Sequence, residues 1–195
     1  TCLSMRFLWL KAHLLGSVTL TLALAVASQP VRTQEENLRE ALCRLVEAAA
    51  KREKLPTGFF TRLIFKESAF RPHVVSPKGA QGVAQFMPST AAEQGLTDPF
   101  DPEQAIPASA KLISQLRARF GNLGLAAAAY NGGPLRVENF RNGRGGLAAE
   151  TQDYVAAITG AAAEDWRAGK SDDDLAHEHD AKCLTLVASD RKSVV

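Results

Sequence analysis

Residues 59–68 read Phe-Phe-Thr-Arg-Leu-Ile-Phe-Lys-Glu-Ser. On an α-helix, Phe60, Leu63 and Ile64 lie one or two turns before Glu67, so its carboxylate falls on the apolar stripe of the helix. A carboxyl group on that stripe loses contact with water, which raises its pKa and keeps it protonated near neutral pH. The stretch therefore indicates a general acid at Glu67. The plainer alternative is a glutamate that snorkels to water or pairs with a buried cation.

Apolar residues recur at helical spacing along most of the chain, so the fold class is predicted to be mainly α. Thr33 and Glu36 have the spacing of a capping box, and the first helix is expected to run from there to Ala50. Further helices are expected up to a stop at Pro72, over 89–94 with Ser89 as its cap, and over 107–120, 123–130 and 149–162. The almost wholly apolar run 123–130 predicts a helix that is buried on all sides. Residues 73–88 are rich in turn formers and predict a loop with a short hairpin or extended segment.

Length and charge limit the classes of protein to consider. A chain of 195 residues with 46% hydrophobic and 23% charged residues is large enough for one domain with its own core. Residues 1–27 contain Arg6 and Lys11 and no acidic residue, which leaves 21 of the 23 basic residues against 21 acidic residues. A neutral chain lacks the basic surface of nucleic-acid-binding proteins, so no nucleic-acid partner is expected.

The N-terminus has the pattern of an export signal. Arg6 and Lys11 precede the apolar stretch 14–27, and Ala25-Val26-Ala27 before Ser28 is a small-residue cleavage site. We therefore predict a signal peptide at 1–27 and a periplasmic protein. The alternative is an uncleaved anchor, although the apolar stretch is shorter than the roughly 20 residues of a membrane span.

The cysteines and the C-terminal tail form a second question. Cys43 and Cys183 remain after the signal, and in an oxidising compartment they form a disulfide or stay as two thiols. Residues 164–195 are polar and acidic and are predicted to be a mobile linker ahead of a short segment around Cys183. Neither the cysteines nor the histidines have metal-ligand spacing, so no metal and no cofactor is expected.

Two further clusters place polar groups beside apolar or glycine-rich segments. Residues 79–88 read Gly-Ala-Gln-Gly-Val-Ala-Gln-Phe-Met-Pro, where glycines let a backbone approach a ligand closely. Residues 127–131 read Ala-Ala-Ala-Tyr-Asn and place a phenol and an amide at the end of the buried helix. Each cluster alone is weak, because a Tyr-Asn pair after alanines is equally a core residue and a helix cap.

In this order, the clusters closely resemble the catalytic domain of the soluble-type (SLT domain) lytic transglycosylases. The matching residues are Glu67-Ser68, Phe70, Pro72, Ser76, Gly79-Ala80, Gly82, Gln85-Phe86-Met87-Pro88, Thr90-Ala91, Asp98-Pro99, Ala128-Ala129-Tyr130-Asn131, Gly133-Pro134, Glu150-Thr151 and Tyr154-Val155. The resemblance covers about residues 38–160 and implies a lysozyme-like, goose-type helical domain over 28–163 with a substrate cleft. Val83-Ala84 and Leu135-Arg136 depart from the residues frequent in that family, which concerns the shape of the cleft and of one loop.

The resemblance implies a defined reaction. Such enzymes cleave the β-1,4 bond between N-acetylmuramic acid and N-acetylglucosamine in peptidoglycan without water as nucleophile, and leave 1,6-anhydro ends. Glu67 would first act as acid and then as base. No second carboxylate is obvious beside the motifs, whereas ordinary glycosidases use two. Asp98 and Asp101 are candidates for a second carboxylate, but an aspartate before proline is first of all a turn former.

The resemblance also assigns further site residues. Tyr130 would hydrogen-bond the carboxylate of Glu67 and tune it, and Ser68 would contact substrate. The remaining substrate-binding residues would be Gln85, Met87, Asn131, Glu150 and Tyr154. For Glu150 the alternative is a carboxylate that only favours a helix N-terminus.

Peptidoglycan strands are the expected partner, and short exported versions of the family also suggest a secretion or conjugation complex of the envelope. Three alternatives stay open: a hydrolase of the same fold, a wall-binding or assembly module without turnover, and a membrane-tethered form.

Overall fold

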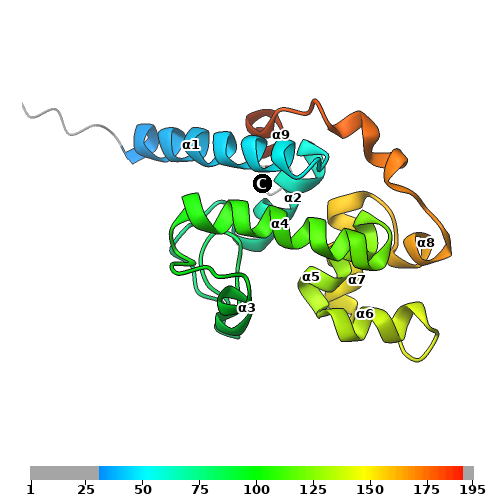
Figure 1. The fold of residues 1–195 in the computed structure, drawn as a ribbon. Helices are drawn as coiled ribbons and strands as arrows, with labels where there is room; N and C mark the ends of the chain where they lie inside the picture. Colours follow the sequence, from blue (N-terminus) through cyan, green and yellow to red (C-terminus); the bar gives the residue numbers. More distant parts are fainter. Residues whose placement is uncertain (1–30, 191–195) are drawn as a thin grey trace, which may run out of the picture.

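The computed structural model describes residues 31–190, with side chains from 37 to 189, and this part of the chain is mainly α as predicted (Figure 1). Its helices are α1 (Val31–Arg52), α2 (Thr57–Ser68), α3 (Pro88–Glu93), α4 (Pro102–Phe120), α5 (Leu123–Gly132), α6 (Pro134–Arg141), α7 (Ala149–Thr159), α8 (Ala163–Ala168), the 3₁₀ helix η1 (Asp172–Glu178) and α9 (Cys183–Asp190). Within residues 31–190, no helix is long and apolar enough to cross a membrane. The predicted signal peptide lies outside the described residues.

Helix α5 is the centre of the fold, and it is buried as its sequence predicts. Seven of its residues, Leu123 to Ala129, are buried, and the helix packs against α4, α6, α7 and α8. At Gly124 an added Cβ would lie 2.0 Å from the ring of Trp166. Trp166 of α8 can therefore pack directly on the backbone of α5 only because residue 124 has no side chain. This close approach ties the chain after α7 to the core.

Several helix ends differ from the sequence prediction. Helix α4 begins at Pro102 instead of Pro107, because Asp101 caps it by accepting a hydrogen bond from the amide of Glu103. Pro107 therefore lies inside the helix and costs one backbone hydrogen bond. Helix α5 continues through Gly132, and the turn comes at Gly133, whose φ of 86° suits glycine.

Three other boundaries were predicted wrongly. Helix α1 begins at Val31, before the expected cap at Thr33, and α3 begins at Pro88, so Ser89 is not its cap. Helix α7 ends at Thr159 because Gly160 takes the left-handed conformation. Helix α6 was not predicted at all, since it buries only Val137 and Phe140 and has almost no apolar periodicity.

The loop between α2 and α3 contains the short extended segment that the sequence predicts. Isolated bridges pair Val75 with Gln81 and Gln81 with Phe86. Gly82 has a φ of 75°, and a Cβ there would lie 1.8 Å from the carbonyl oxygen of Pro99. The loop can pack against the chain before α4 only with glycine at this position.

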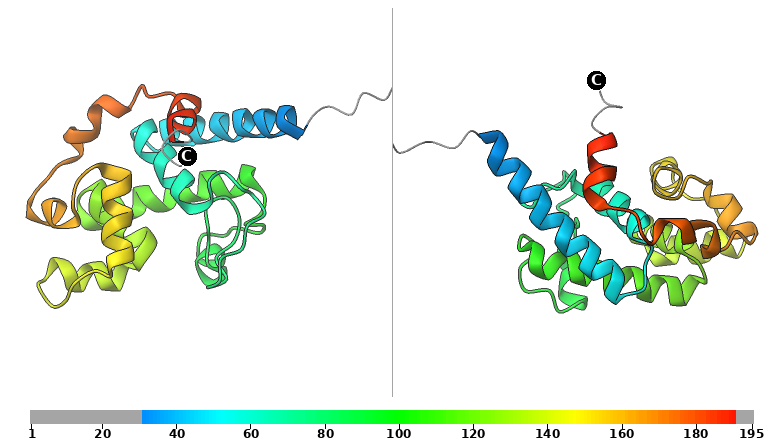
Figure 2. Two further views of the ribbon diagram at one scale, coloured as in Figure 1. Left: turned by 180° about the vertical axis from the view of Figure 1, so that it is seen from behind. Right: turned by 90° about the horizontal axis from the view of Figure 1, so that it is seen from above.

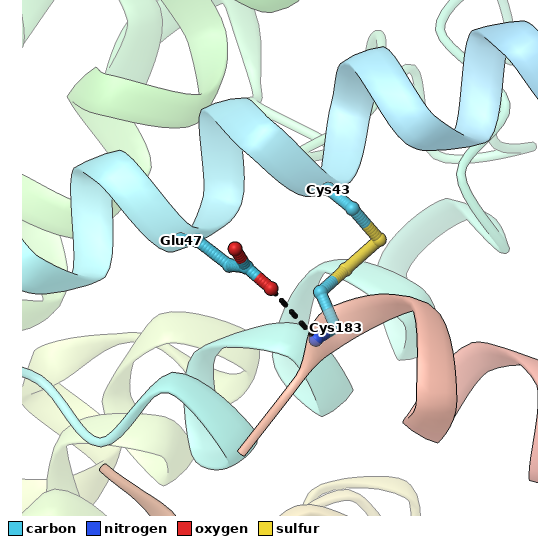
Figure 3. The surroundings of a disulfide bond; sticks show 3 residues. All are labelled: Cys43, Glu47 and Cys183. Atoms are coloured by element: carbon cyan, nitrogen blue, oxygen red, sulfur yellow. Dashed lines mark hydrogen bonds between the residues drawn. A yellow bond between two sulfur atoms is a disulfide. The ribbon is translucent and has the colours of Figure 1, made fainter. Parts of the chain in front are cut away.

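Over residues 164–190, the part of the tail that the structure describes, the prediction of a mobile linker was wrong. Residues 163–190 form α8, η1 and α9, which return over α2 to α1 and bury Trp166, Leu175 and Val187 (Figure 2). Cys183 at the start of α9 forms a disulfide with Cys43 on α1 (Figure 3). We call residues 163–190 the C-terminal belt. Its few apolar residues are buried in the core. The prediction failed because it used the average composition of the segment, which is polar, and not the position of these residues.

Candidate active site

Glu67 lies in the last turn of α2, where its carboxyl group is half-buried. Phe60, Leu63 and Ile64 on the same side of the helix are fully buried, as the spacing predicts. The helix ends directly after Ser68, because Ala69 takes the left-handed conformation with a φ of 51° and its amide donates to the carbonyl of Phe65 at 2.7 Å. The carboxyl group is thus fixed at a helix end against the apolar core.

The hydrogen-bond partner of Glu67 is Tyr154. The hydroxyl of Tyr154, a buried residue of α7, donates to Oε1 of Glu67. The sequence prediction gave this position to Tyr130, and that was wrong. The hydroxyl of Tyr130 donates to the carbonyl of Ala84 at 2.7 Å, because the loop backbone lies against it. Its one proton is used there, so Ser109 on α4, 3.0 Å away, donates to the Tyr130 oxygen.

Burial raises the pKa of Glu67 from its ordinary value of 4.5 to about 7. The hydrogen bond from Tyr154 acts in the opposite direction and lowers the pKa, while the negative charge of Glu150 raises it and Lys66 lowers it. Both the protonated and the ionised form are therefore populated near neutral pH. The carboxyl group can donate a proton and can also accept one, which a glutamate at its ordinary pKa does poorly.

Both tyrosines stay protonated beside this carboxyl group. Burial, followed by the charge of Glu67, raises the pKa of Tyr130 and of Tyr154 above the ordinary value of 10. They are neutral hydroxyl groups and place no second negative charge at the site.

Glu150 lies one helical turn before Tyr154, on the same side of α7. Its side chain is 69% exposed, and its carboxylate pairs with Lys78 of the α2–α3 loop at 3.1 Å. Its negative charge raises the pKa of Glu67, so a second carboxylate does act on Glu67, although the motifs did not make one obvious. Glu150 also lies in the first turn of α7, so the helix-terminus interpretation applies to it as well.

Three of the predicted substrate-binding residues hold the protein itself together. Ser68 is buried, with its hydroxyl 3.5 Å from the carbonyl of Ile64. The side-chain amide of Gln85 donates to the carbonyls of Val74 and Gly82 at 3.2 and 2.9 Å. Gln85 itself has a φ of 51°. The carbonyl oxygen of the Asn131 side chain accepts from the hydroxyl of Thr151 at 2.8 Å. Met87, in contrast, is 41% exposed and free to meet a ligand.

Asp98 and Asp101 are turn formers, as the simpler interpretation predicts. Asp98 accepts from the amide of Phe100 at 2.8 Å, and Asp101 caps α4. Sequence reasoning missed Ser109 and Lys78. A signal for Ser109 exists, since a serine on the inward face of an apolar helix needs a hydrogen-bond partner. No local pattern marks Lys78, because its partner lies 72 residues away.

Comparison with known proteins decides the family. The model of the transglycosylase SLT domain matches residues 44–152, which is more than half of the 195-residue chain. The chain belongs to the transglycosylase SLT domain family. The match includes Glu67, the α2–α3 loop, α5 and the first turn of α7, and it ends just before Tyr154.

Relatives of this SLT domain agree with that assignment. The transglycosylase of Enterobacteria phage PRD1 is 34% identical over 88 residues, which are 45% of this chain and 33% of the phage protein. The soluble lytic murein transglycosylase of Escherichia coli K12 is 32% identical over 117 residues, which are 54% of this chain and 18% of that protein. The chain thus spans a third or less of the length of these relatives.

Solved structures show the same fold. An inactive glutamate-to-glutamine mutant of lytic transglycosylase Slt from Pseudomonas aeruginosa has a TM-score of 0.54 and 31% identity, over 60% of this chain and 22% of that one. The 70 kDa soluble lytic transglycosylase of Escherichia coli has a TM-score of 0.56 and 26% identity, over 79% of this chain and 27% of that one. The prediction of a mainly α, lysozyme-like SLT domain is confirmed. The substrate cleft stays a prediction.

Proposed function

We propose that this chain is a lytic transglycosylase that cleaves the β-1,4 bond between N-acetylmuramic acid and N-acetylglucosamine in peptidoglycan and leaves 1,6-anhydro ends. The observation that carries the proposal is the state of Glu67: a half-buried carboxyl group bonded to a neutral phenol, with a pKa of about 7. Family membership supports it, as does the relative from Pseudomonas aeruginosa, which is inactive when a glutamate is replaced by glutamine.

The reaction needs one group that is first an acid and then a base. Protonated Glu67 gives its proton to the glycosidic oxygen, and the bond from that oxygen to C1 of the muramic sugar breaks. The resulting carboxylate takes the proton of the C6 hydroxyl of the same sugar, and O6 bonds to C1. Glu67 ends protonated, and no water is consumed. A pKa near 7 suits both halves of this cycle at neutral pH.

The neighbouring residues have separate roles in this proposal. Tyr154 stabilises the carboxylate form of Glu67 between the two steps, because its hydrogen bond favours the charged state. Met87 and Glu150 are exposed and meet the sugar strand or its peptide. Four other predicted site residues affect substrate binding indirectly, because their hydrogen bonds fix the protein segments around the site. These are Ser68, Gln85, Asn131 and Tyr130.

A hydrolase of the same fold is the second candidate function, and Glu150 is the observation that favours it. A second carboxylate near the acid is what a hydrolytic glycosidase uses to activate water or to attack the sugar. The charge of Glu150 reaches Glu67, but its carboxylate is largely exposed and paired with Lys78. We therefore assign Glu150 to substrate binding.

Mass spectrometry of the muropeptides released from purified sacculi separates these functions. The proposal expects 1,6-anhydro products, and products one water heavier would make the protein a hydrolase. The Glu67→Gln variant should lose at least about 100-fold in rate, the lower end of the contribution of acid–base catalysis. The exposed variant Glu40→Gln on α1 is the control. A wild-type protein that binds sacculi and releases nothing would instead support the wall-binding module.

We also propose a periplasmic location after removal of residues 1–27. The disulfide between Cys43 and Cys183 requires an oxidising compartment. In this proposal the partners are peptidoglycan and a secretion or conjugation complex of the envelope. N-terminal sequencing of the exported protein should give Ser28 as the first residue. Full-length protein in the membrane fraction would support the tethered form.

A further inference from the structure

Four arginines gather where the C-terminal ends of α4, α6 and α8 meet. Arg119 is in the last turn of α4, Arg141 in the last turn of α6, Arg144 in the loop that follows, and Arg167 in the last turn of α8. All four are exposed. In Figure 1, α6 lies at the lower right and α1 runs along the top, with α4 between them. We call these four residues the arginine cluster.

Two aromatic rings hold the cluster in place. The guanidinium groups of Arg119 and Arg141 lie 5.3 and 5.8 Å from the centre of the Phe120 ring. Arg167 lies 4.7 Å from the centre of the Phe140 ring and donates to the Phe140 carbonyl at 3.3 Å. Both rings belong to the core, so they are rigid supports. A stacked guanidinium loses less freedom on binding an anion than a free one does.

The cluster already holds one carboxylate. Arg119 donates to Oε1 of Glu138 at 2.6 Å, and this hydrogen bond, followed by the charges of Arg119, Arg141 and Arg144, lowers the pKa of Glu138. Within the part of the chain that the structure describes, Arg141 and Arg144 form no ion pair with a side chain. One carboxylate against four guanidinium groups leaves three positive charges in excess, on a protein that is close to neutral.

Helix dipoles explain part of this arrangement. Arg119, Arg141 and Arg167 lie at the C-terminal ends of helices, where a positive charge is stabilising. Arg144 lies beyond α6, in the loop, yet its charge also reaches Glu138. A purely stabilising role predicts that loss of Arg141 and Arg144 lowers the melting temperature and changes nothing else, which gives the test its second readout.

We propose that the arginine cluster is a second substrate contact, which binds carboxylate groups of the peptide stems carried by the peptidoglycan strand. This inference rests on the proposed function, which makes peptidoglycan the ligand. Guanidinium groups match carboxylates in shape and charge, and the stems, not the sugars, carry the carboxylates of that polymer. The contact lies on α4, α6 and α8, so it engages peptides at a distance along the strand from the bond next to Glu67.

Binding to intact sacculi tests this directly. The Glu67→Gln protein binds without cleaving and is the reference in a co-sedimentation assay. Adding Arg141→Gln and Arg144→Gln should weaken binding about tenfold at low salt, the effect of losing two exposed charge contacts of about 0.7 kcal/mol each. The matched control adds Arg44→Gln and Lys182→Gln, two exposed residues next to Cys43 and Cys183, which removes the same charge beside the disulfide and should leave binding unchanged.

Chemically modified sacculi identify the group that is bound. When the peptide carboxylates are converted to amides, the reference protein should bind as weakly as the cluster variant. Unchanged binding to amidated sacculi, or an equal loss in the matched control, would overturn the proposal. If the double variant unfolds, Arg144→Gln alone replaces it, since that side chain lies in a surface loop. Muropeptide release by the wild-type protein, measured in parallel, shows separately whether the proposed function itself holds.

Discussion

Helix α2 has a carboxyl group at each of two places: Glu178 of the belt binds to its side, and Glu67 lies at its C-terminal end. The first has a cationic partner and the second a neutral one. Glu178 of the C-terminal belt is bound by the guanidinium of Arg62, with both oxygens 2.6 Å from Nη2. Glu67 at the end of the same helix is bound by the neutral hydroxyl of Tyr154. A cation stabilises the charged form of its partner strongly, whereas a neutral phenol offsets only part of the effect of burial. Glu178 therefore stabilises the fold as a permanent anion, whereas Glu67 can still gain and lose a proton near neutral pH.

The same contrast extends beyond these two residues. Asp172 of the belt accepts from Arg117 at 2.6 Å and from the amide of Leu123 at 2.6 Å. Glu47 on α1 accepts from the amide of Cys183 of the belt at 3.0 Å. Each of these carboxylates finds a donor from another element. Around Glu67 the bonded partner is the neutral hydroxyl of Tyr154, and the charges of Glu150 and Lys66 shift its pKa in opposite directions. Substitutions in the belt should therefore lower the free energy of unfolding, whereas substitutions around Glu67 should change the pH dependence of activity.

The largest effect on stability should come from the disulfide that closes the belt. Replacing Cys43 and Cys183 by serine frees a loop of 140 residues and should lower the free energy of unfolding by about 2–5 kcal/mol. Denaturant unfolding measures this loss. The pH dependence of activity should stay that of the wild-type protein wherever the variant is folded. A shifted pH profile would mean that the belt also sets the environment of Glu67.

The Glu178→Gln variant should lower the free energy of unfolding by about 1–3 kcal/mol at pH 7, because Arg62 is left partly buried without its counter-ion. Thermal or denaturant unfolding at pH 7 checks the prediction. The exposed acid Glu40 on α1, replaced by glutamine, is the control. If both variants have the same free energy of unfolding, the ion pair between Arg62 and Glu178 does not stabilise the fold, and a stabilising role for the belt carboxylate is contradicted.

The Glu67→Gln variant should have the opposite sign. Burial raises the pKa of Glu67 to about 7 in the folded protein, so the folded state binds more protons than the unfolded state between about pH 4.5 and 7. The stability from neutral Glu67 is present below pH 4.5 and is lost as the pH rises through 7. Glutamine stays neutral, so the variant should gain about 1–2 kcal/mol over wild type at pH 8 and nothing at pH 4.5. Unfolding curves at both pH values decide this, and equal stability at pH 8 would contradict a raised pKa.

The Tyr154→Phe variant should shift the acid–base behaviour of the site upward. The hydrogen bond from Tyr154 lowers the pKa of Glu67, so its loss moves that pKa above about 7. The pH profile of kcat/KM should move to more alkaline pH, with a rate loss of about tenfold or more at pH 7. Tyr130→Phe is the matched control, since that hydroxyl bonds to Ala84 and Ser109. Equal shifts in both variants would return the tuning role to Tyr130.

The smallest effect should come from Glu150. Its negative charge raises the pKa of Glu67, so Glu150→Gln should move the pH profile to more acidic pH, by less than one unit because the carboxylate is exposed. The direction is opposite to that of Tyr154→Phe, which makes the two variants a pair. Added salt should shrink the shift caused by Glu150 and leave that of Tyr154 in place. A shift that does not respond to salt would show a direct contact in place of a charge effect.

Local patterns were sufficient wherever a residue and its partner lie within a few turns. The apolar stripe of α2, the buried helix α5 and the turns at Asp98 and Asp101 are all encoded within short windows of sequence. Spacing alone places Glu67 against the core. Helix α6 and the belt escaped prediction because each buries only a few apolar residues, and those meet partners from distant segments.

The sequence by itself determined that a carboxyl group would lie on the apolar face of a helix in a mainly α chain, because helical periodicity is a local property. Which tyrosine binds it was decided only by the tertiary structure. Tyr130 and Tyr154 lie on different helices, and the folded chain directs one hydroxyl to the loop carbonyl of Ala84 and the other to Glu67 across 87 residues. A hydroxyl has one proton, and its direction depends on which acceptor packing brings within reach.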